Sequence, residues 1–231
     1  MKKLLPALAI LSLLAPAVRA EEGVVGEVCR WDFKRGDLFW KNWQFYNTQP
    51  MVSGTGFTVE RVPGTVDGFA LIVEAKSSSG FVITMPRDLD LRKYPYLHWR
   101  WRIVRPLNIA AGSAEPDDQA GVIYIADGTN LRHSSIGYRW EYNTQIGAES
   151  LIKYRGGLTT VKSICLRNRK SPVGEWVEEE RNVLLDYRAA FGKTLSVGFA
   201  LTVGANTQHS QSDTRLEIDY IEFRSTPALR K

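Results

Sequence analysis

The sequence has few of the residues and motifs on which enzyme chemistry usually depends. Its 231 residues include only two cysteines and three histidines, and the histidines are too scattered to form a metal-binding motif. It contains no G-x-S-x-G elbow, no phosphate-binding P-loop and no C-x-x-C pair. These absences exclude the common signatures of serine hydrolases, P-loop nucleotide-binding proteins and thiol redox proteins. A site built from residues far apart in the chain stays open.

The N-terminus also lacks an apolar run long enough to cross a bilayer. A positive segment, residues 1–3, precedes an apolar stretch over residues 4–17. That stretch is shorter than the roughly 18 residues of a membrane-spanning helix, so the pattern favours a cleaved signal peptide over an uncleaved anchor. Small or modest residues at Val18 and Ala20 predict cleavage after Ala20.

We therefore expect a signal peptide over residues 1–20 and a single mature domain over residues 21–231. A lipoprotein would need a cysteine directly after the cleavage site, but Cys29 lies nine residues beyond Ala20. The predicted destination is the periplasm or the medium, with no membrane insertion after cleavage.

Charge gives little reason to expect a nucleic-acid partner. The whole chain carries a net charge of +5. Removal of Lys2, Lys3 and Arg19 with the signal peptide leaves 27 basic and 25 acidic residues, a net charge of +2. A nucleic-acid-binding domain is usually much more basic, so we expect no nucleic acid.

Alternating apolar and polar residues dominate the mature part, with Gly, Pro and Asn between the alternating segments. The pattern predicts strands at 28–33, 57–62, 70–75, 80–86, 96–104, 120–126, 135–142, 149–154, 159–167, 175–185, 194–203 and 215–223. It predicts one short helix over 186–191, ended by Gly192. We expect an all-β fold, a two-sheet antiparallel β-sandwich of jelly-roll type.

The two cysteines allow two interpretations. In an oxidising compartment, Cys29 and Cys165 could form a disulfide. The bridge would close a loop of about 135 residues, which corresponds to roughly 5 kcal/mol as an upper figure. The alternative is two separate, buried, apolar thiols. The sequence leaves both open.

Two blocks of opposite charge follow each other in the chain. Residues 153–170 hold six cations and no acid, and four glutamates follow within residues 175–180. Residues 171–174 between them have the composition of a turn. The pattern predicts a hairpin with opposite charges facing across the strands, in preference to a basic ligand patch.

Two predicted strands carry charged residues at every second position. Arg100 and Arg102 share one face of the first strand, and Arg139 and Glu141 share one face of the second. Buried charges need partners, so these faces are expected to meet water or to line a polar groove. These four residues are our candidate ligand-binding residues. The alternative is an Arg–Glu lattice that only keeps the outer sheet soluble. The opposite faces are expected to form the core: Leu97, Trp99, Trp101 and Ile103 in one strand, and Ile136, Tyr138, Trp140 and Tyr142 in the other.

Acidic residues suggest two further sites. Glu115, Asp117 and Asp118 cluster in one predicted loop. Asp117 and Asp118 are candidate calcium ligands, although the segment is equally a good turn composition. Apart from calcium, we expect no cofactor.

A glycosidase would need two carboxylates across a cleft, and four carboxylates lie in or beside predicted strands. These are Glu141, Glu180, Asp186 and Asp219. Exposed carboxylates on strands are common, so this pattern alone assigns no catalytic residue.

Aromatic residues are plentiful, with seven Trp and nine Tyr. Carbohydrate-binding sites combine flat apolar rings with a few placed polar groups. β-Sandwiches also bury their tryptophans. For Trp99 and Trp101, burial in the core is the favoured interpretation.

Several blocks together resemble an exported bacterial family, the domain of unknown function 3047. They are YPYLHWRWR at 94–102, DD at 117–118, Trp176, ERNV at 180–183, DYR at 186–188 and FG at 191–192. The resemblance spans about residues 31–223 and implies a β-sandwich in the cell envelope, without an assigned activity. The family's acidic D-T-D-N-T stretch reads VGANT here, at 203–207. A cation site in that loop would therefore be lost in this chain.

The first and last predicted strands also resemble those of carbohydrate-binding jelly rolls, as an analogy of fold alone. The favoured hypothesis is a non-catalytic periplasmic or secreted binding module with a glycan ligand. The alternatives are a polysaccharide hydrolase or lyase, and a structural envelope protein that binds a partner through a sheet edge. An acidic pair in a groove would favour the enzyme. An exposed, coplanar Trp–Tyr platform would favour the binding module, and a long unprotected edge strand the structural protein.

Overall fold

The computed structural model describes residues 28–31, 33–34, 41–46, 54–86, 88–109, 117–129, 131–196 and 198–228. The predicted signal peptide lies outside this part of the chain, so its cleavage stays a prediction. Within the described residues, no helix has both the length and the apolarity to cross a membrane.

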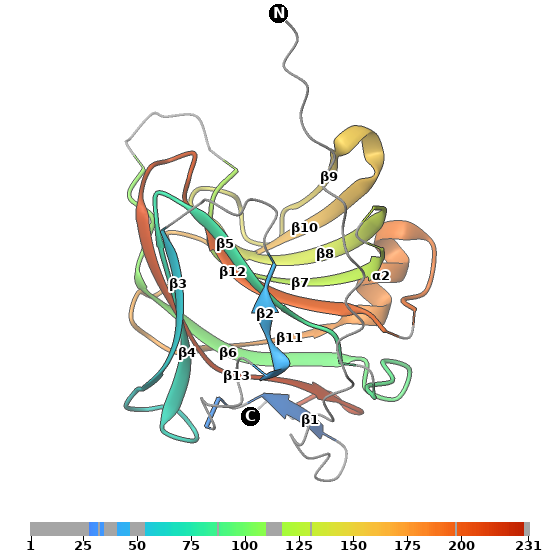
Figure 1. Ribbon diagram of the computed structural model, residues 1–231, viewed down its shortest axis with the longest axis horizontal. Helices are drawn as coiled ribbons and strands as arrows, with labels where there is room; N and C mark the ends of the chain where they lie inside the picture. Colours follow the sequence, from blue (N-terminus) through green and yellow to red (C-terminus); the bar gives the residue numbers. More distant parts are fainter. Residues whose placement is uncertain are drawn as a thin grey trace, which may run out of the picture.

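The described residues form two β-sheets packed face to face (Figure 1). Sheet A has the strand order β11-β6-β13-β4-β3, and β1 also pairs with β13. Its strands are β1 (Val28–Trp31), β3 (Thr55–Arg61), β4 (Phe69–Lys76), β6 (Tyr96–Arg105), β11 (Val177–Asn182) and β13 (Asp213–Arg224).

Sheet B has the strand order β2-β5-β12-β7-β8-β10-β9. Its strands are β2 (Gln44–Phe45), β5 (Ser79–Thr84), β7 (Gln119–Gly128), β8 (His133–Trp140), β9 (Glu149–Tyr154), β10 (Thr159–Arg167) and β12 (Ala200–Asn206). Among the described strand pairs, β8 and β10 run parallel and the others antiparallel. The predicted all-β, two-sheet sandwich is confirmed.

The core between the sheets is rich in aromatic side chains. Trp99 and Trp101 from β6 are fully buried and meet edge to face, with ring centroids 5.5 Å apart. From the other sheet, Tyr138 lies 5.5 Å from Trp99 and Trp140 lies 5.7 Å from Trp101. Such ring pairs add about 0.5–1.5 kcal/mol each beyond the area they bury. The predicted burial of Trp99 and Trp101 is confirmed.

The helix α2 (Val183–Phe191) begins three residues earlier than predicted. Its N-cap is Asn182, whose side chain accepts a hydrogen bond from the backbone N–H of Leu185. This cap ends β11 at Asn182, so the strand prediction over 175–185 was too long at that end. Gly192 ends the helix in the left-handed conformation, with φ 66°, as predicted.

The predicted hairpin between the basic and acidic blocks is wrong. β10 lies in sheet B between β8 and β9, whereas β11 lies at the edge of sheet A beside β6. An ion pair between Arg167 and Glu179 still joins the two segments. The other glutamates of β11 face β6: Glu178 pairs with Arg100, and Glu180 with His98, across the two strands.

The structure does not bridge Cys29 and Cys165. Cys29 lies on β1 of sheet A, opposite Phe223, and Cys165 lies on β10 of sheet B. The Cys165 thiol lies 3.3 Å from the carbonyl oxygen of Arg167. Of the two interpretations left open by the sequence, the bridged one is absent from this structure, in which the two residues lie on different sheets.

Candidate functional site

The outward face of sheet B is hollowed into an open groove of about 1050 Å³. In Figure 1 the strands of this sheet curve across the upper half of the molecule, from β5 to β9. Five adjacent strands, β5, β12, β7, β8 and β10, form the floor. At about 4.8 Å per strand the floor is roughly 19 Å wide. Side chains on it include Phe81, Thr202, Tyr124, Ser135, Arg139 and Val161.

Two pairs of an aromatic residue and a glycine shape the floor. Tyr124 on β7 lies opposite Gly137 on β8, and Phe81 on β5 lies opposite Gly204 on β12. A Cβ atom on Gly137 would lie 2.4 Å from Tyr124 Cε1, and one on Gly204 would lie 2.4 Å from Phe81 Cδ1. Each ring therefore occupies the space that its partner's side chain would fill. The two rings meet edge to face, with centroids 6.0 Å apart and planes at 62°.

One flank of the groove is apolar. Phe45 on β2 and Phe57 on β3 meet edge to face, with ring centroids 5.8 Å apart. Phe45 is 57% exposed, and Met85, just after β5, is also exposed. Large exposed apolar side chains that line a hollow are typical of ligand-binding surfaces.

The opposite part of the groove is polar and is centred on Arg139. Its Nη1 lies 3.0 Å from Asp117 Oδ1, and its Nη2 donates to the hydroxyl of Tyr124 at 3.2 Å. Glu141 lies 3.6 Å from Nη1. The hydroxyl of Tyr154, at the sheet edge, donates to the other oxygen of Asp117 at 2.9 Å. A chain of polar contacts thus connects Tyr124, on the floor, with Tyr154, on the rim.

Burial and neighbouring charges shift the pKa values in this cluster. Arg139 is only 4% exposed. Burial opposes its charge, but Tyr124, Asp117 and Glu141 outweigh that effect and raise its pKa. Burial, with the nearby Asp117 carboxylate, raises the pKa of Tyr154 to about 12. Burial likewise raises the pKa of Tyr124. At neutral pH the tyrosines are hydrogen-bonding phenols and Arg139 is a fixed cation.

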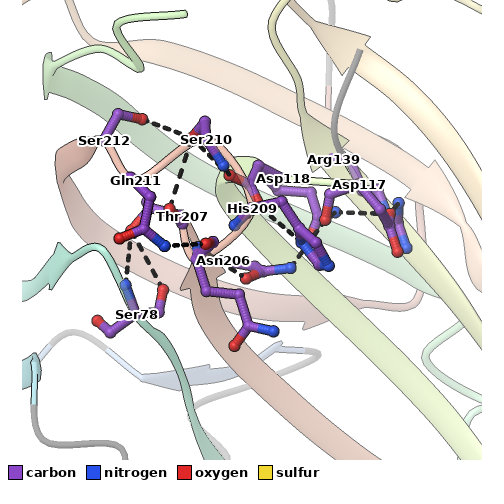
Figure 2. A network of polar contacts seen from close by, with 12 residues as sticks. Ser78, Asp117, Asp118, Arg139, Asn206, Thr207, His209, Ser210, Gln211 and Ser212 are labelled. Carbon is purple, nitrogen blue, oxygen red and sulfur yellow. Dashed lines mark hydrogen bonds and ion pairs between the residues drawn. The ribbon is translucent and has the colours of Figure 1, made fainter. Parts of the chain in front are cut away.

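The loop after β12 forms a lip of the groove and is held by Asp118 (Figure 2). The buried Asp118 carboxylate accepts hydrogen bonds from the backbone N–H groups of His209 and Ser210. It also accepts from the His209 ring at 3.0 Å and from the Ser210 hydroxyl. On the other side of the loop, Thr207 and Ser78 exchange two hydrogen bonds. The lip is therefore fixed before any ligand arrives.

Asp118, His209 and Ser210 do not form a nucleophilic triad. In such a triad the serine donates to the histidine, which in turn donates to the aspartate. Here His209 and Ser210 both donate to the same Asp118 carboxylate. Since that carboxylate only accepts, the His209 Nδ1 carries a proton and donates it to Asp118. The half-exposed imidazole lines the groove as a hydrogen-bonding group.

The predicted calcium ligands Asp117 and Asp118 both bond to protein donors instead. Asp117 binds Arg139 and Tyr154, and Asp118 holds the lip. Glu115 lies outside the described residues. Among those that are described, no three His, Cys, Asp or Glu side chains gather in a way that could hold a metal ion. Calcium binding at these residues stays an untested prediction.

The structure separates the four candidate ligand-binding residues. Arg100 and Arg102 lie on sheet A, where they pair with Asp219 and Glu217, each at 2.7 Å. Arg139 lines the groove of sheet B. Glu141 follows Arg139 two residues later in the chain, and its carboxylate lies 3.6 Å from the Arg139 guanidinium. The four residues do not share one groove, because their two strands belong to different sheets, and ligand binding by any of them stays a prediction.

The four candidate catalytic carboxylates are also dispersed. Glu180 and Asp219 belong to sheet A, Asp186 to helix α2, and Glu141 follows β8. Of the described carboxylates, Asp117 and Asp127 line the groove.

Both groove carboxylates are engaged by the protein. Asp117 binds Arg139, and Asp127 accepts hydrogen bonds from Ser196 and from Tyr187. The groove thus offers no pair of unengaged carboxylates among the residues that the structure describes.

The fold and the groove together define a two-sheet β-sandwich with one hollowed outer face. Residues 40–222 match the family model DUF3047, described as a protein of unknown function. The chain therefore belongs to the DUF3047 family. A comparison with curated proteins finds no match.

Several solved structures are similar to this chain. The xyloglucanase domain of NopAA, a type three effector from Sinorhizobium fredii in complex with cellobiose, is 12% identical, with a TM-score of 0.45 over 80% of this chain and 95% of that one. A family 11 carbohydrate-binding module from Clostridium thermocellum, in complex with a β-1,3-1,4-mixed-linked tetrasaccharide, is 13% identical, with a TM-score of 0.45 over 86% and 95%. Cellulose induced protein Cip1 is 13% identical, with a TM-score of 0.46 over 87% and 99%. All three TM-scores are below 0.5, so these similarities identify no ligand for this chain.

Proposed function

We propose that the chain is a non-catalytic glycan-binding domain and that the sugar chain occupies the groove of sheet B. The observation that carries this proposal is the composition of the groove. Aromatic rings on its floor and flank lie beside a fixed set of hydrogen-bonding groups. Sugar rings have apolar C–H faces and hydroxyl edges, and such a surface complements both.

The size of the groove supports an oligosaccharide ligand. A volume of about 1050 Å³ is at the upper end of the range for small-molecule sites. The floor crosses five strands, so a chain of several rings fits it better than a single sugar does.

Preorganisation supports binding as well. The four hydrogen bonds to Asp118 and the contacts of Arg139 hold the polar groups in place. Ligand binding is then opposed by a smaller free-energy cost, because fewer protein side chains have to become ordered. The groove carboxylates Asp117 and Asp127, which a glycosidase would need as acid and base, are themselves bonded to protein groups. This favours a binding domain over a hydrolase.

Export is part of the proposal. The predicted signal peptide over residues 1–20 would deliver the domain to the periplasm or the medium, where polysaccharides are available. Intact-mass measurement of material from the producing cell checks this, because the mature chain should begin at Glu21.

The test of function is a binding screen of the purified protein against soluble and insoluble polysaccharides, with reducing-sugar release measured in parallel. Binding of any glycan found in the screen should be lost or weakened by Phe81→Ala, which removes an aromatic ring from the groove floor. The control is Trp176→Ala, which removes an aromatic ring from the outer face of sheet A. Absence of any glycan binding, or equal effects of the two variants, would refute the proposal. Release of reducing ends would establish the enzyme alternative.

A further inference from the structure

We infer that the groove takes a single chain of a neutral polysaccharide, and that neither a polyuronate nor the flat surface of a crystalline polysaccharide is its ligand. The inference rests on the proposed function and narrows it to one ligand class. Two independent features lead to it: the balance of charge in the groove and the angles between its rings.

The positive charge of Arg139, at the centre of the groove, is outweighed by the negative charges of its neighbours. Arg139 has Asp117 at 3.0 Å and Glu141 at 3.6 Å, so the cluster carries one cation and two anions. Asp117 is 42% exposed in its side chain and faces the groove. A ligand carboxylate near Arg139 would therefore meet a net negative cluster. Like charges brought together in this way disfavour binding.

Among the described residues, the other charged side chains that line the groove add one cation, Arg155. Asp127, at the far end, is balanced by Lys193 at 3.9 Å. Arg155 lies at the exposed rim, where water screens its charge. His133 lines the same end, and its burial lowers its pKa below the ordinary value of 6.5. It is therefore neutral at pH 7. A polyuronate with one charge per sugar would need several uncompensated cations along the groove, and the described residues do not provide them.

The ring geometry excludes a flat ligand. The floor rings of Phe81 and Tyr124 lie at 62° to each other, and the flank rings of Phe45 and Phe57 at 75°. A crystalline polysaccharide presents many sugar rings in one plane and needs coplanar aromatic residues. The lip formed by the loop at His209 also lines the hollow. A recessed floor with inclined rings fits one flexible chain whose successive sugars are rotated.

The polar groups are also of the kind that neutral sugars need. The groove offers the hydroxyl groups of Tyr154 and Thr202, the amides of Gln119 and Asn206, and the ring of His209. These groups donate to or accept from hydroxyl groups without requiring a charge on the ligand. Recognition by them is insensitive to salt, unlike the binding of a polyanion to arginines.

The experiment compares three kinds of probe with the full-length mature protein, by titration calorimetry or affinity electrophoresis. The neutral probes are soluble mixed-linked β-glucan, xyloglucan and galactomannan, the acidic probes are polygalacturonate and alginate, and the insoluble probe is microcrystalline cellulose. We expect at least one neutral polymer to bind, with Kd changing less than about twofold between 50 and 500 mM NaCl. The acidic and crystalline probes should not bind measurably.

A charge variant sharpens the test. The double substitution Asp117→Asn with Glu141→Gln keeps the side-chain shapes and leaves the Arg139 charge uncompensated. It should raise the affinity for polygalacturonate relative to the neutral polymer by about fivefold at low salt. Circular dichroism of the variant verifies that the fold is retained. If it is not, Asp117→Asn alone is used.

The outcomes separate the two proposals. Salt-sensitive binding of a polyuronate by the unmodified protein, or binding of crystalline cellulose, overturns this inference but keeps the glycan-binding function. If none of the three probe classes binds, the proposed function itself fails. An unchanged affinity ratio in the folded charge variant also overturns the inference, because the charge balance would then not exclude acidic glycans.

Discussion

The outer faces of the two sheets have similar residue types and different shapes. On sheet A, Arg100 and Arg102 pair with Asp219 and Glu217, and the Trp176 ring packs against both guanidiniums, with centroids 5.1 and 4.4 Å away. On sheet B, the corresponding face is hollowed around Arg139. Arginines at every second position therefore do not distinguish a closed ionic lattice from a ligand groove.

Small residues at outward positions make the difference. The outward faces of β7, β8 and β12 include Ala126, Ser135, Gly137, Ala200 and Gly204. The outward face of β13, in sheet A, carries long charged side chains that pair with those of β6. A sheet face becomes concave and open where its side chains are short, and it becomes covered where they are long.

The largest expected effect comes from Arg139, because it is the most buried cation of either face. Arg139→Leu leaves Asp117 and Glu141 without their cation. Breaking a buried pair costs about 3 kcal/mol at the low end of the usual range. For a domain of this size the melting temperature should fall by about 6–12 °C.

The matched control is Arg102→Leu on sheet A. The buried Glu217 keeps its hydrogen bond from Arg215 at 2.9 Å and so retains a cation, which should make the loss clearly smaller than in Arg139→Leu. Thermal unfolding measures both variants. Equal losses would contradict the contrast between the two faces.

The two floor glycines should differ from each other. A Cβ on Gly204 would lie 2.2 Å from the backbone oxygen of Gly80, which cannot move easily. Gly204→Ala should therefore lower stability by about 2 kcal/mol. In Gly137→Ala the three nearest atoms all belong to the Tyr124 ring, and a side-chain ring can rotate more easily than backbone can move. That variant should unfold closer to the parent temperature and lose glycan affinity. Calorimetry and titration of both variants check this, and equal melting temperatures would show that the backbone clash is relieved.

A smaller effect is expected at the rim. Tyr154→Phe removes the hydrogen bond to Asp117 and should cost about 1 kcal/mol or less, since the group is partly exposed. The pKa of Tyr154 is raised from 10.0 to about 12, so the folded state favours the neutral phenol. That contribution is present below pH 10 and is lost as pH rises toward 12. Denaturant unfolding at pH 8 and pH 11 should show a smaller loss in the variant than in the parent.

Sequence periodicity predicted the faces of individual strands well. The alternation in 96–104 correctly assigned Trp99 and Trp101 to the core, and Gly192 correctly marked the end of the helix. These features depend on local geometry, because alternate side chains of a strand point to opposite faces. A local pattern suffices to detect them.

The order of the strands in each sheet is not local, and here prediction failed. Arg100 and Arg139 each lie between two aromatic residues in sequence, yet β6 and β8 belong to different sheets. The acidic strand β11 pairs with β6 instead of the basic β10 that precedes it. Opposite charges do face each other across strands, but the pair is Glu178 on β11 and Arg100 on β6. Only the folded topology identifies this partner.

The aromatic residues of the groove floor were missed for the same reason. Phe81 and Tyr124 have no distinctive sequence context, and their role depends on the glycines opposite them in neighbouring strands. An exposed Trp–Tyr platform would have favoured the binding module, but the tryptophans at 99, 101 and 140 lie in the core. The sequence signal that could have pointed to the groove is a glycine on an otherwise polar strand face, such as Gly137, because such a glycine often marks the close approach of another group.

The smallest expected effect is a pH dependence at His133, at the end of the groove away from Arg139. Burial lowers the pKa of His133 from its ordinary value of 6.5, with a smaller contribution from the positive charge of Arg155. The folded state therefore binds fewer protons than the unfolded state. Its stability is complete above pH 6.5 and decreases as pH falls below that value.

His133→Gln removes this titration, so the difference in melting temperature between pH 7.5 and pH 5.5 should be smaller in the variant than in the parent. The titration of Glu222 does not interfere with this measurement. Burial opposes its charge, but its bond to His98 and the nearby arginines lower its pKa below 4.5, so its contribution is lost only at more acidic pH. Thermal unfolding at several pH values between 5 and 8 gives the comparison. An identical pH profile in the variant would mean that His133 is equally easy to protonate in the folded and unfolded chains, and that this end of the groove is as well hydrated as the exposed rim.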